Sequence, residues 1–517
     1  MAEHVYTKAD LITRFDDILD KTFADIDNKG IFEHVKQFGS QKGIAGTIIE
    51  QCVLGYDPDT KQEPDLVVVD GYLKKKTELK TTGMVLSDTP KDHFVAKEPM
   101  SITAVGIYDI AEQTFDTSHF WSKLEHMLLV YYHYAANQAV PPYEYRDFPI
   151  KGYEFHEFTE DEINTLQTDW EYVRALAERV VANHPGERDK AWKEAVKQEY
   201  IDVHGELRRV LSYIDLAPKF PPRFRLKKPV VSSIINKHFG FDLEQLPGKY
   251  SVVSDIDRKC HELTQQYSGM TIGELAKLFN VSVTTEAGGD PKSVAEQIVV
   301  NMFGGTSQKL NQIELFTRFG LIGKTIVTTA KGGRTEDMKL FHVDFDEVTR
   351  KEVIDEDGSI RPILFEDSEL YQYFADHAFL CIIFEEPALE KTGKKSKKSL
   401  SDNKFVGFKR LVFGDNFIDG PVRTLWEDIR NKVLNNTLID VVQTRADGTP
   451  ITISTGEISS APNFMKSSQN AVFMRGSGKN SSMQYKKECV NGIHMLPQYV
   501  WLKGLSVIEE LEKVPEL

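Results

Sequence analysis

The apolar and polar positions between residues 63 and 81 predict a β-hairpin. A short β-branched run from Leu66 to Val69 is followed by the pair Gly71-Tyr72 and then by a run from Lys74 to Thr81 that alternates in polarity. A glycine in first place of a two-residue loop is typical of a tight hairpin turn. The stretch therefore predicts two paired strands, and the rest of the chain is interpreted around it.

The register of this hairpin brings charged residues together. If Asp70 and Leu73 flank the turn, Asp65 lies opposite Glu78. Cross-strand partners project from the same face with Cβ atoms roughly 5 Å apart, and Lys80, two residues beyond Glu78, shares that face. Asp70 falls on the other face. The pattern predicts two carboxylates and one ammonium at one point, and it favours Asp65 over Asp70.

This group of charges suits a hard divalent cation. Mg²⁺ takes oxygen ligands, keeps several waters, and is usually held by one or two protein carboxylates and a substrate phosphate. A neighbouring lysine can orient the attacking water and balance the charge of a phosphoryl transition state. The alternative is an exposed hairpin with ordinary surface charges, because Pro-Asp followed by Glu-x-Lys arises by chance in a chain in which 27% of residues are charged.

Periodicity elsewhere predicts an alternation of helices and strands. We expect helices over residues 7–21, 42–55, 159–183, 186–213 and 230–238, strands over 100–110 and 128–134, and an extended segment over 221–228. The first helix is capped by Thr7 and has an apolar stripe made of Leu11, Ile12, Phe15, Ile18 and Leu19. Gly55 ends the second. Glu50 lies inside that apolar helix, where it either faces solvent or supplies a third acid near the metal.

Two basic segments of the first half are candidates for contact with phosphate. His119 and Lys123 lie between the two predicted strands, in a segment that is otherwise read as a solvated loop. Arg225, Lys227 and Lys228 follow Phe224 in the extended segment, and basic residues interleaved with an aromatic suit contact with a DNA backbone. A β-edge guarded by lysines explains that second run equally well.

After residues 248–257 the chain repeats itself weakly. Segments recur in the same order at a spacing of about 250 residues, as expected of two copies of one fold. The paired segments are 22–26 with 271–275, 42–55 with 292–305, 79–81 with 323–325, 168–174 with 424–430, and 226–227 with 502–503. We therefore predict two domains, residues 1–248 and residues 258–517.

The second copy lacks the acids of the first. Val300 stands at the position of Glu50 and Ile322 at that of Glu78, whereas the lysine at position 80 has a counterpart in Lys324. A site without carboxylates cannot hold Mg²⁺ in the same way, so this pattern predicts one catalytic copy and one binding copy.

Basic or polar segments suggest where the second copy meets DNA. Residues 391–410 are rich in lysine, and residues 459–487 are rich in Ser, Asn and Gly and contain Arg475 and Lys479. Lys503 is the counterpart of Lys227. Such residues carry donors for phosphates and base edges, and the alternative for both segments is a solvated linker or surface loop.

Composition limits the class of protein. The chain has 517 residues, of which 41% are apolar, a net charge of −15 and four cysteines without a Cys-x-x-Cys pair. We expect a cytoplasmic protein that is neither secreted nor membrane-spanning, with reduced thiols. The acidic balance argues against a generally adhesive polycation, yet a local basic groove on an acidic body remains compatible with DNA binding.

Taken together, these segments resemble the MutH family, which contains the mismatch-repair nicking endonuclease and its two-domain relatives among type II restriction enzymes that cut at GATC. The similarity is strongest in short segments, which are Lys42-Gly43 with Glu50, Pro64-Asp65 with Glu78-Leu79-Lys80, Thr117-Ser118-His119 with Lys123, Trp170-Glu171, Phe224 to Lys228, and, in the second half, Asp419 to Arg423 with Trp426.

The resemblance implies an α/β fold with two tandem restriction-endonuclease-like domains, each a central mixed sheet flanked by helices, the second catalytically degenerate. It implies Mg²⁺-dependent hydrolysis of DNA, with Asp65 and Glu78 binding the metal, Lys80 serving the attacking water, and Glu50 and Lys123 supporting them. By the same resemblance the second domain binds a further copy of the recognition site and acts allosterically, often through DNA looping.

The chain departs from the family pattern in its longer hairpin and in Arg225, where the mismatch-repair relative has an aromatic residue. A recognition loop is visible only in the second copy, near Arg475 and Lys479. We expect a monomer or a dimer induced by double-stranded DNA. Two alternatives stay open, a strand-nicking endonuclease of mismatch-repair type and a non-catalytic DNA-binding protein.

Overall fold

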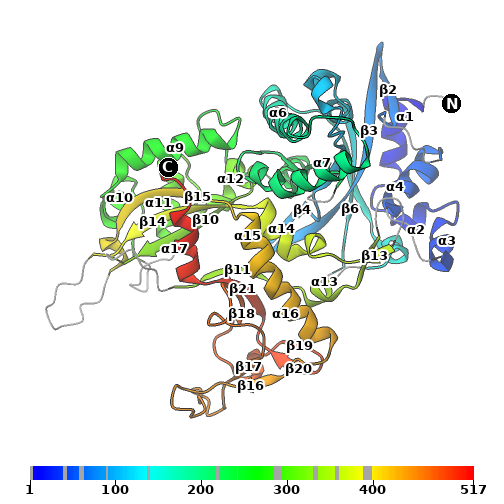
Figure 1. The fold of residues 1–517 in the computed structure, drawn as a ribbon. Coiled ribbons are helices and arrows are strands. Elements are labelled where there is room, and N and C mark those ends of the chain that lie inside the picture. The colour runs from blue at the N-terminus through cyan, green and yellow to red at the C-terminus, as the bar shows by residue number, and fades with distance from the viewer. Residues whose placement is uncertain are drawn as a thin grey trace. The chain divides into compact units, whose positions relative to one another are not determined.

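The computed structural model describes residues 4–38, 43–57, 63–88, 91–136, 140–216, 220–241, 243–284, 293–329, 336–354, 360–387 and 399–517. The chain divides into two compact units (Figure 1). Unit 1 comprises Met1–Lys259, Val299–Ile322 and Val353–Arg361, and unit 2 comprises Cys260–Ile298, Gly323–Glu352 and Pro362–Leu517. Two short segments of the expected second half therefore group with unit 1.

Unit 1 is built on a central mixed sheet of the order β1-β2-β3-β6-β7, with β4 paired to β3. The strands are β1 (Val5–Thr7), β2 (Leu66–Asp70), β3 (Leu73–Asp88), β4 (Lys91–Ala96), β6 (Met127–His133) and β7 (Ile150–His156). Strand β2 is parallel to β1 and antiparallel to β3, and β6 is parallel to β3 and antiparallel to β7. A second sheet has the order β5 (Met100–Ala104), β9 (Arg223–Leu226) and β8 (Ile214–Leu216).

Helices flank the central sheet, so the predicted α/β class is confirmed for this unit. They are α1 (Lys8–Asp16), α2 (Phe23–Ile26), α3 (Ile31–Phe38), α4 (Ile44–Ile48), the π-helix η1 (Ile49–Leu54), α5 (His119–Leu124), α6 (Glu160–Ala182), α7 (Lys190–Val203), α8 (Lys228–His238) and α12 (Glu314–Arg318). Leu11 and Phe15 of α1 and Ile48 of α4 share one buried core with Leu66 and Leu128 of the sheet. The N-terminal helices thus cover one face of the sheet by burying apolar surface.

The predicted hairpin register is confirmed. Leu66 pairs with Thr77 and Asp70 with Leu73, around a two-residue turn whose Gly71 has φ +61°. That backbone conformation favours glycine over any residue with a Cβ. The turn chemistry and the short apolar strand therefore fix which charged residues meet.

The helix starts predicted at Thr7 and at residue 159 are confirmed, although a cap was predicted only at Thr7. The Thr7 hydroxyl accepts from Asp10 N at the start of α1, and Thr159 begins α6 with a capping box to Glu162. Gly55 ends the second helix in the left-handed region, at φ +87°. These helix ends could be predicted from the sequence because capping depends on residues close in sequence.

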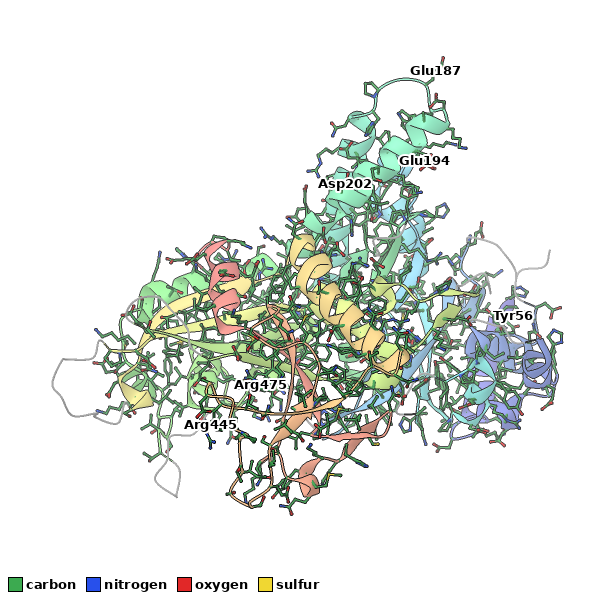
Figure 2. The ribbon with its side chains drawn as sticks, turned by 60° about the horizontal axis from the view of Figure 1, so that its bottom comes forward. Tyr56, Glu187, Glu194, Asp202, Arg445 and Arg475 are labelled. Atoms are coloured by element: carbon green, nitrogen blue, oxygen red, sulfur yellow. The ribbon has the colours of Figure 1, made fainter. Side chains whose placement is uncertain are left out.

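Several predicted elements differ in the structure. Helix α1 stops at Asp16, and Ile12 and Leu19 are each 38% exposed rather than part of the apolar stripe. The strand predicted over 100–110 ends at Ala104. The helix predicted over 186–213 is α7, which Glu194 and Asp202 mark in Figure 2, followed by the 3-10 helix η5 (His204–Arg209), with Glu187 before α7.

Unit 2 contains smaller sheets. Its strands are β10 (Leu321–Thr328), β11 (Met338–His342), β14 (Ala378–Glu385), β15 (Lys404–Leu411), β16 (Asp440–Val442), β17 (Ser460–Pro462), β18 (Val472–Gly476), β19 (Glu488–Val490), β20 (Ile493–Met495) and β21 (Gln498–Leu502). They form the orders β10-β14-β15, β11-β21-β18, β16-β17 and β19-β20, and the short pair β12 (Glu352–Ile354) and β13 (Ile360–Pro362) lies where the two units divide.

The helices of unit 2 are α10 (Ile272–Leu278), α13 (Phe345–Thr349), α14 (Glu369–Asp376), α15 (Asp415–Phe417), the π-helix η9 (Ile418–Val422), α16 (Arg423–Leu434) and α17 (Gly504–Glu512). The division between the units passes through α9 (Val253–Tyr267), α11 (Val294–Met302) and β10. In the part of the chain that is described, no helix is both long and apolar enough to cross a membrane.

Candidate active site

Asp65 lies at the entry of β2, where the ladder with β3 ends. Its Oδ2 accepts a hydrogen bond from Leu79 N at 2.9 Å, so the carboxylate takes the place of a backbone acceptor beside Glu78. Burial raises the pKa of Asp65, and Glu78 raises it further against the lowering effects of the Leu79 amide and of Lys123 and Lys80. Asp70, in contrast, is exposed and pairs with Lys8 at 2.9 Å. The structure separates the two aspartates as the register predicts.

Glu78 is the buried centre of this group and is 1% exposed. Its Oε1 lies 2.8 Å from Lys80 Nζ, and Lys123 Nζ lies 3.0 Å from Oε1 and 2.9 Å from Oε2. A buried carboxylate needs such partners because an unpaired charge away from water is costly. The structure thus brings together Asp65, Glu78, Lys80 and Lys123.

Glu50 lies in the π-helix η1 and is half-buried. Its backbone carbonyl accepts from Gly55 N at 2.8 Å and from Tyr56 N at 3.1 Å, which closes the helix end. Burial raises the pKa of the Tyr56 hydroxyl, and the carboxylates of Glu50, Asp65 and Glu78 raise it further. One tyrosine therefore lies in the field of all three predicted acids.

The donor set fits a single divalent cation. Asp65 and Glu78 offer two carboxylates, as Mg²⁺ usually takes from a protein. Burial and, after it, the Glu78 carboxylate raise the pKa of Asp65, and a bound cation would offset both effects. The described residues contain no group of three or more His, Cys, Asp or Glu side chains arranged to hold a metal. A cation here would therefore take its remaining ligands from water, backbone or substrate.

A cavity of about 430 Å³ opens beside this group. Its lining includes Lys123 and His119 of α5, Arg223 of β9 and Trp170 of α6. His119 is exposed at the first turn of α5, whose N-cap Ser118 accepts from Trp121 N. The cavity joins the two residues predicted to contact phosphate with a further arginine that the sequence did not single out.

The basic run after Phe224 separates into different environments. Arg225 forms an ion pair with Asp215, and although burial alone would raise the pKa of that carboxyl, the guanidinium lowers it. Lys227 is buried and donates to Leu211 O at 2.6 Å. Lys228 is half-buried at the start of α8. In this state Arg225 and Lys227 hold β8 and the preceding turn, so their DNA contacts stay predictions.

The residues of unit 2 that were predicted to contact DNA lie on different elements. Lys324 donates to Lys339 O at 3.1 Å, and Lys503 is the N-cap of α17. Lys479 is exposed. Arg475, marked in Figure 2, pairs with Asp337 at 2.7 Å. Lys42 of unit 1 and residues 391–398 of the basic segment lie outside the described residues.

Arg475 has the best-defined surroundings of these. Its guanidinium lies 4.9 Å from the ring centres of both Phe473 and Trp501, and it lines a cavity of about 270 Å³ together with Lys466 and Gln498. Cation–π contacts hold such a guanidinium in a fixed place.

Comparison with known proteins bears on this site directly. Residues 54–169 match the family model described as "DNA mismatch repair enzyme MutH". The chain is therefore similar to the MutH family over these residues. That match spans Asp65, Glu78, Lys80 and Lys123, while Glu50 precedes it. The MutH resemblance expected from short segments is confirmed.

A second similarity extends over most of the chain. The "Type II restriction enzyme Sau3AI" of Staphylococcus aureus is 22% identical over 420 residues, which cover 79% of this chain and 77% of that enzyme. The aligned length exceeds the MutH match, so the likeness to the restriction enzyme includes residues outside the MutH-like domain. The predicted enzyme class, a site-specific deoxyribonuclease, agrees with both comparisons.

Sequence reasoning missed Tyr56, Arg223 and the pairing of Arg225. Tyr56 follows Gly55, the predicted helix end, so its closeness to Glu50 was available as a local signal. Arg223 depends on β9 meeting β5, which lies far away in sequence, and the pairing of Arg225 depends on β9 meeting β8.

Proposed function

We propose that the protein is a Mg²⁺-dependent, sequence-specific endonuclease of double-stranded DNA, of the type II restriction class. The observation that carries the proposal is the buried Glu78 carboxylate, which meets Lys80 and Lys123 beside Asp65. The MutH-family match over residues 54–169 and the restriction-enzyme relative support it.

Each residue of the group has a role that its environment supports. Asp65 and Glu78 are the carboxylates to hold Mg²⁺, which when bound supplies a Lewis acid for the phosphoryl oxygen. Lys80 is 23% exposed, against 2% for the Glu78 side chain, so it is the lysine placed to orient the attacking water. Lys123 fixes both oxygens of Glu78. Water adds to phosphorus, one phosphorus–oxygen bond breaks, and the leaving oxygen takes a proton.

The cavity beside the acids supports a path for the DNA backbone. His119, Lys123 and Arg223 bring cationic or donor groups to one lining, and phosphate contacts of this kind position a duplex without reading its sequence. We assign His119 and Lys228 to contact with the DNA backbone. Arg225 and Lys227 are assigned to holding the fold, through their contacts with Asp215 and Leu211.

We further propose that unit 2 contains a degenerate copy of the fold that binds DNA and acts as an effector. Two three-stranded sheets support it, since β5-β9-β8 and β11-β21-β18 share one order and one register. Leu226 pairs with Met100 and Ile214 in the first, and Leu502 pairs with Met338 and Val472 in the second.

Matching side-chain contacts strengthen the repeat. In unit 1 the ring of Phe115 lies 6.2 Å from that of Trp170, over which Arg174 lies at 5.9 Å. In unit 2 Phe365 lies 5.7 Å from Trp426, over which Arg430 lies at 4.6 Å. Ser118 and Ser368, which cap the following helices α5 and α14, both donate to the carbonyl of the preceding phenylalanine at 2.6 Å.

By the sequence repeat, Val300 and Ile322 stand in the places of Glu50 and Glu78, and both belong to the segment Val299–Ile322 that groups with unit 1. The second copy therefore lacks these two acids and suits binding without catalysis, and we assign Lys324, Arg475, Lys479 and Lys503 of unit 2 to it as DNA-contact candidates. GATC or a related site, engagement of two sites by looping, and a monomer or DNA-induced dimer are part of the proposal. The four free cysteines accord with a cytoplasmic location.

Incubation of the purified protein with plasmid DNA tests the proposal. With Mg²⁺ the plasmid should be cut at defined sites and sequencing of the ends should return one recognition sequence, whereas EDTA should stop cutting. Full activity of a Glu78→Ala variant overturns the assigned site. Nicked circles in place of linear product favour the mismatch-repair type, which the MutH-family match also supports. DNA retention without any metal-dependent product favours a non-catalytic DNA-binding protein.

A further inference from the structure

Tyr56 carries a buried hydroxyl that no residue of the described chain satisfies. Its Oη is enclosed and has no hydrogen-bond partner among the described residues, whereas Tyr56 N donates to Glu50 O. Burying a hydroxyl without a partner costs free energy, because the group gives up its hydrogen bonds to water. Figure 2 marks this residue near the N-terminal helices of unit 1.

The local fold holds the ring in this place. Gly55 turns the chain at φ +87°, so that Gly55 N and Tyr56 N both donate to Glu50 O. The ring then stacks on His4, with centroids 4.0 Å apart and planes inclined by 20°. The stack helps to hold the ring in the folded state, in which the hydroxyl has no partner among the described residues.

Tyr56 lies close to the acids of the candidate metal site. Its amide donates to Glu50 O, and its ring packs against the core that contains Leu66 and Leu79, the residues that follow Asp65 and Glu78 in the chain. Burial raises the pKa of the hydroxyl, and the carboxylates of Glu50, Asp65 and Glu78 raise it further. A tyrosine hydroxyl carries a proton at neutral pH and is a hydrogen-bond donor. An unpaired donor in the field of three acids is placed for an oxygen atom that arrives with a ligand.

A neighbouring tyrosine shows what an ordinary structural hydroxyl does in this region. Tyr6 Oη donates to Leu54 O at 2.9 Å, two residues before Tyr56 in the chain. Tyr6 belongs to β1 and its hydroxyl binds the end of η1, whereas Tyr56 follows η1 and its hydroxyl lacks a partner among the described residues. The pair provides a matched comparison between a hydroxyl used for folding and one left for a ligand.

We propose that Tyr56 is a positioning residue of the metal site, whose hydroxyl donates to an oxygen atom brought by the cation at Asp65 and Glu78. That oxygen belongs either to a water of the cation's shell or to a phosphate of the DNA, and both present the same acceptor. The inference rests on the proposed function, since it requires that Asp65 and Glu78 bind a divalent ion.

The test compares Tyr56→Phe with Tyr6→Phe in the full chain, using Mn²⁺ as the probe. Binding of Mn²⁺ without DNA is measured by isothermal titration calorimetry, and DNA binding is measured in Ca²⁺ under conditions that give no product. A shell water predicts about tenfold weaker Mn²⁺ binding by Tyr56→Phe, whereas a phosphate oxygen predicts unchanged Mn²⁺ binding and about tenfold weaker DNA binding. Tyr6→Phe should change neither affinity.

Thermal unfolding without metal should shift in opposite directions in the two variants. Tyr56→Phe should unfold at the same or a higher temperature, because an unsatisfied hydroxyl is removed, and Tyr6→Phe at a lower one. Unchanged Mn²⁺ and DNA affinities of Tyr56→Phe, or a lower unfolding temperature, overturn the proposal for Tyr56. A wild-type protein that binds no Mn²⁺ overturns the proposed metal site and the role of Tyr56 with it.

Discussion

Lys123 Nζ lies 3.0 Å and 2.9 Å from the two oxygens of Glu78, and both residues are buried. The lysine comes from α5 and the glutamate from β3, so this ion pair joins a helix to the central sheet. Because Lys80 reaches the same carboxylate, one buried negative charge is shared by two ammonium groups. Because Asp65 lies beside it, the group holds two carboxylates and two ammonium groups, and its formal charges balance.

Removal of Lys123 should destabilise the protein as well as slow DNA cleavage. In Lys123→Met the Glu78 carboxylate keeps only Lys80, and we expect a loss of roughly 1–3 kcal/mol of stability. Denaturant unfolding followed by a probe in unit 1 measures this. Lys8→Met is the control, because its exposed pair with Asp70 should contribute less than about 1 kcal/mol. Equal losses of stability in Lys123→Met and Lys8→Met would contradict the claim that the buried pair of Lys123 and Glu78 stabilises the fold.

Stability should depend on pH through Glu347 of α13. Burial, and after it the Glu369 carboxylate, raise the pKa of Glu347 from 4.5 to about 7. An acid whose folded pKa is raised binds a proton more tightly in the folded state, so its contribution is present below pH 4.5 and is lost as the pH rises through about 7. Glu347→Gln should therefore gain stability relative to wild type between pH 5 and pH 8, by roughly 1–3 kcal/mol.

Thermal midpoints of both proteins across that pH range check this prediction. Glu352→Gln serves as the control, because Glu352 is exposed. A constant difference in midpoint between wild type and Glu347→Gln from pH 5 to pH 8 contradicts the raised pKa.

Two residues of the basic run, Arg225 and Lys228, should differ in the property that their removal changes. Arg225→Ala leaves the Asp215 carboxylate without its guanidinium and should lower stability. Lys228→Ala leaves folding intact and removes one phosphate contact, so the slope of log affinity against log salt should fall by about 0.9. Fluorescence anisotropy at several salt concentrations measures the slope. An unchanged slope for Lys228→Ala removes this lysine from the interface.

The sequence predicted features that depend on neighbours in the chain. The turn at Gly71-Tyr72 set the hairpin register, and with it the choice of Asp65 over Asp70. The caps Thr7 and Thr159 set two helix starts. Each depends on contacts within a few residues, for which sequence rules are physical rules.

Features that depend on packing or on pairing between strands could not be predicted from the sequence. The π-helix after Ile48 looked like ordinary helix, since the two differ by one residue per hydrogen-bonded turn. Ile12 and Leu19 carry the apolar character of a stripe, yet α1 ends before Leu19 and both side chains stay exposed. Arg225 looked like a free cation because Asp215 stands on another strand.

The second unit should make cutting depend on the number of sites. If it binds a further recognition site as an effector, plasmids with two sites should be cut several times faster than plasmids with one, at equal site concentration. Arg475→Ala should reduce that difference, because the arginine is held by Asp337, Phe473 and Trp501 in a cavity of unit 2. Equal rates on both plasmids in the wild-type protein remove the effector role and leave the nuclease assignment in place.

The most direct test of the central claim is Mg²⁺-dependent plasmid cutting by Asp65→Asn and Asp70→Asn side by side. The two aspartates belong to one hairpin, and each substitution removes one negative charge without changing side-chain size. We predict that Asp65→Asn loses cutting by about a thousandfold or more, and that Asp70→Asn, which breaks only an exposed pair with Lys8, stays within about twofold of wild type. Full activity of Asp65→Asn, or equal losses in both variants, would contradict the site at Asp65 and Glu78.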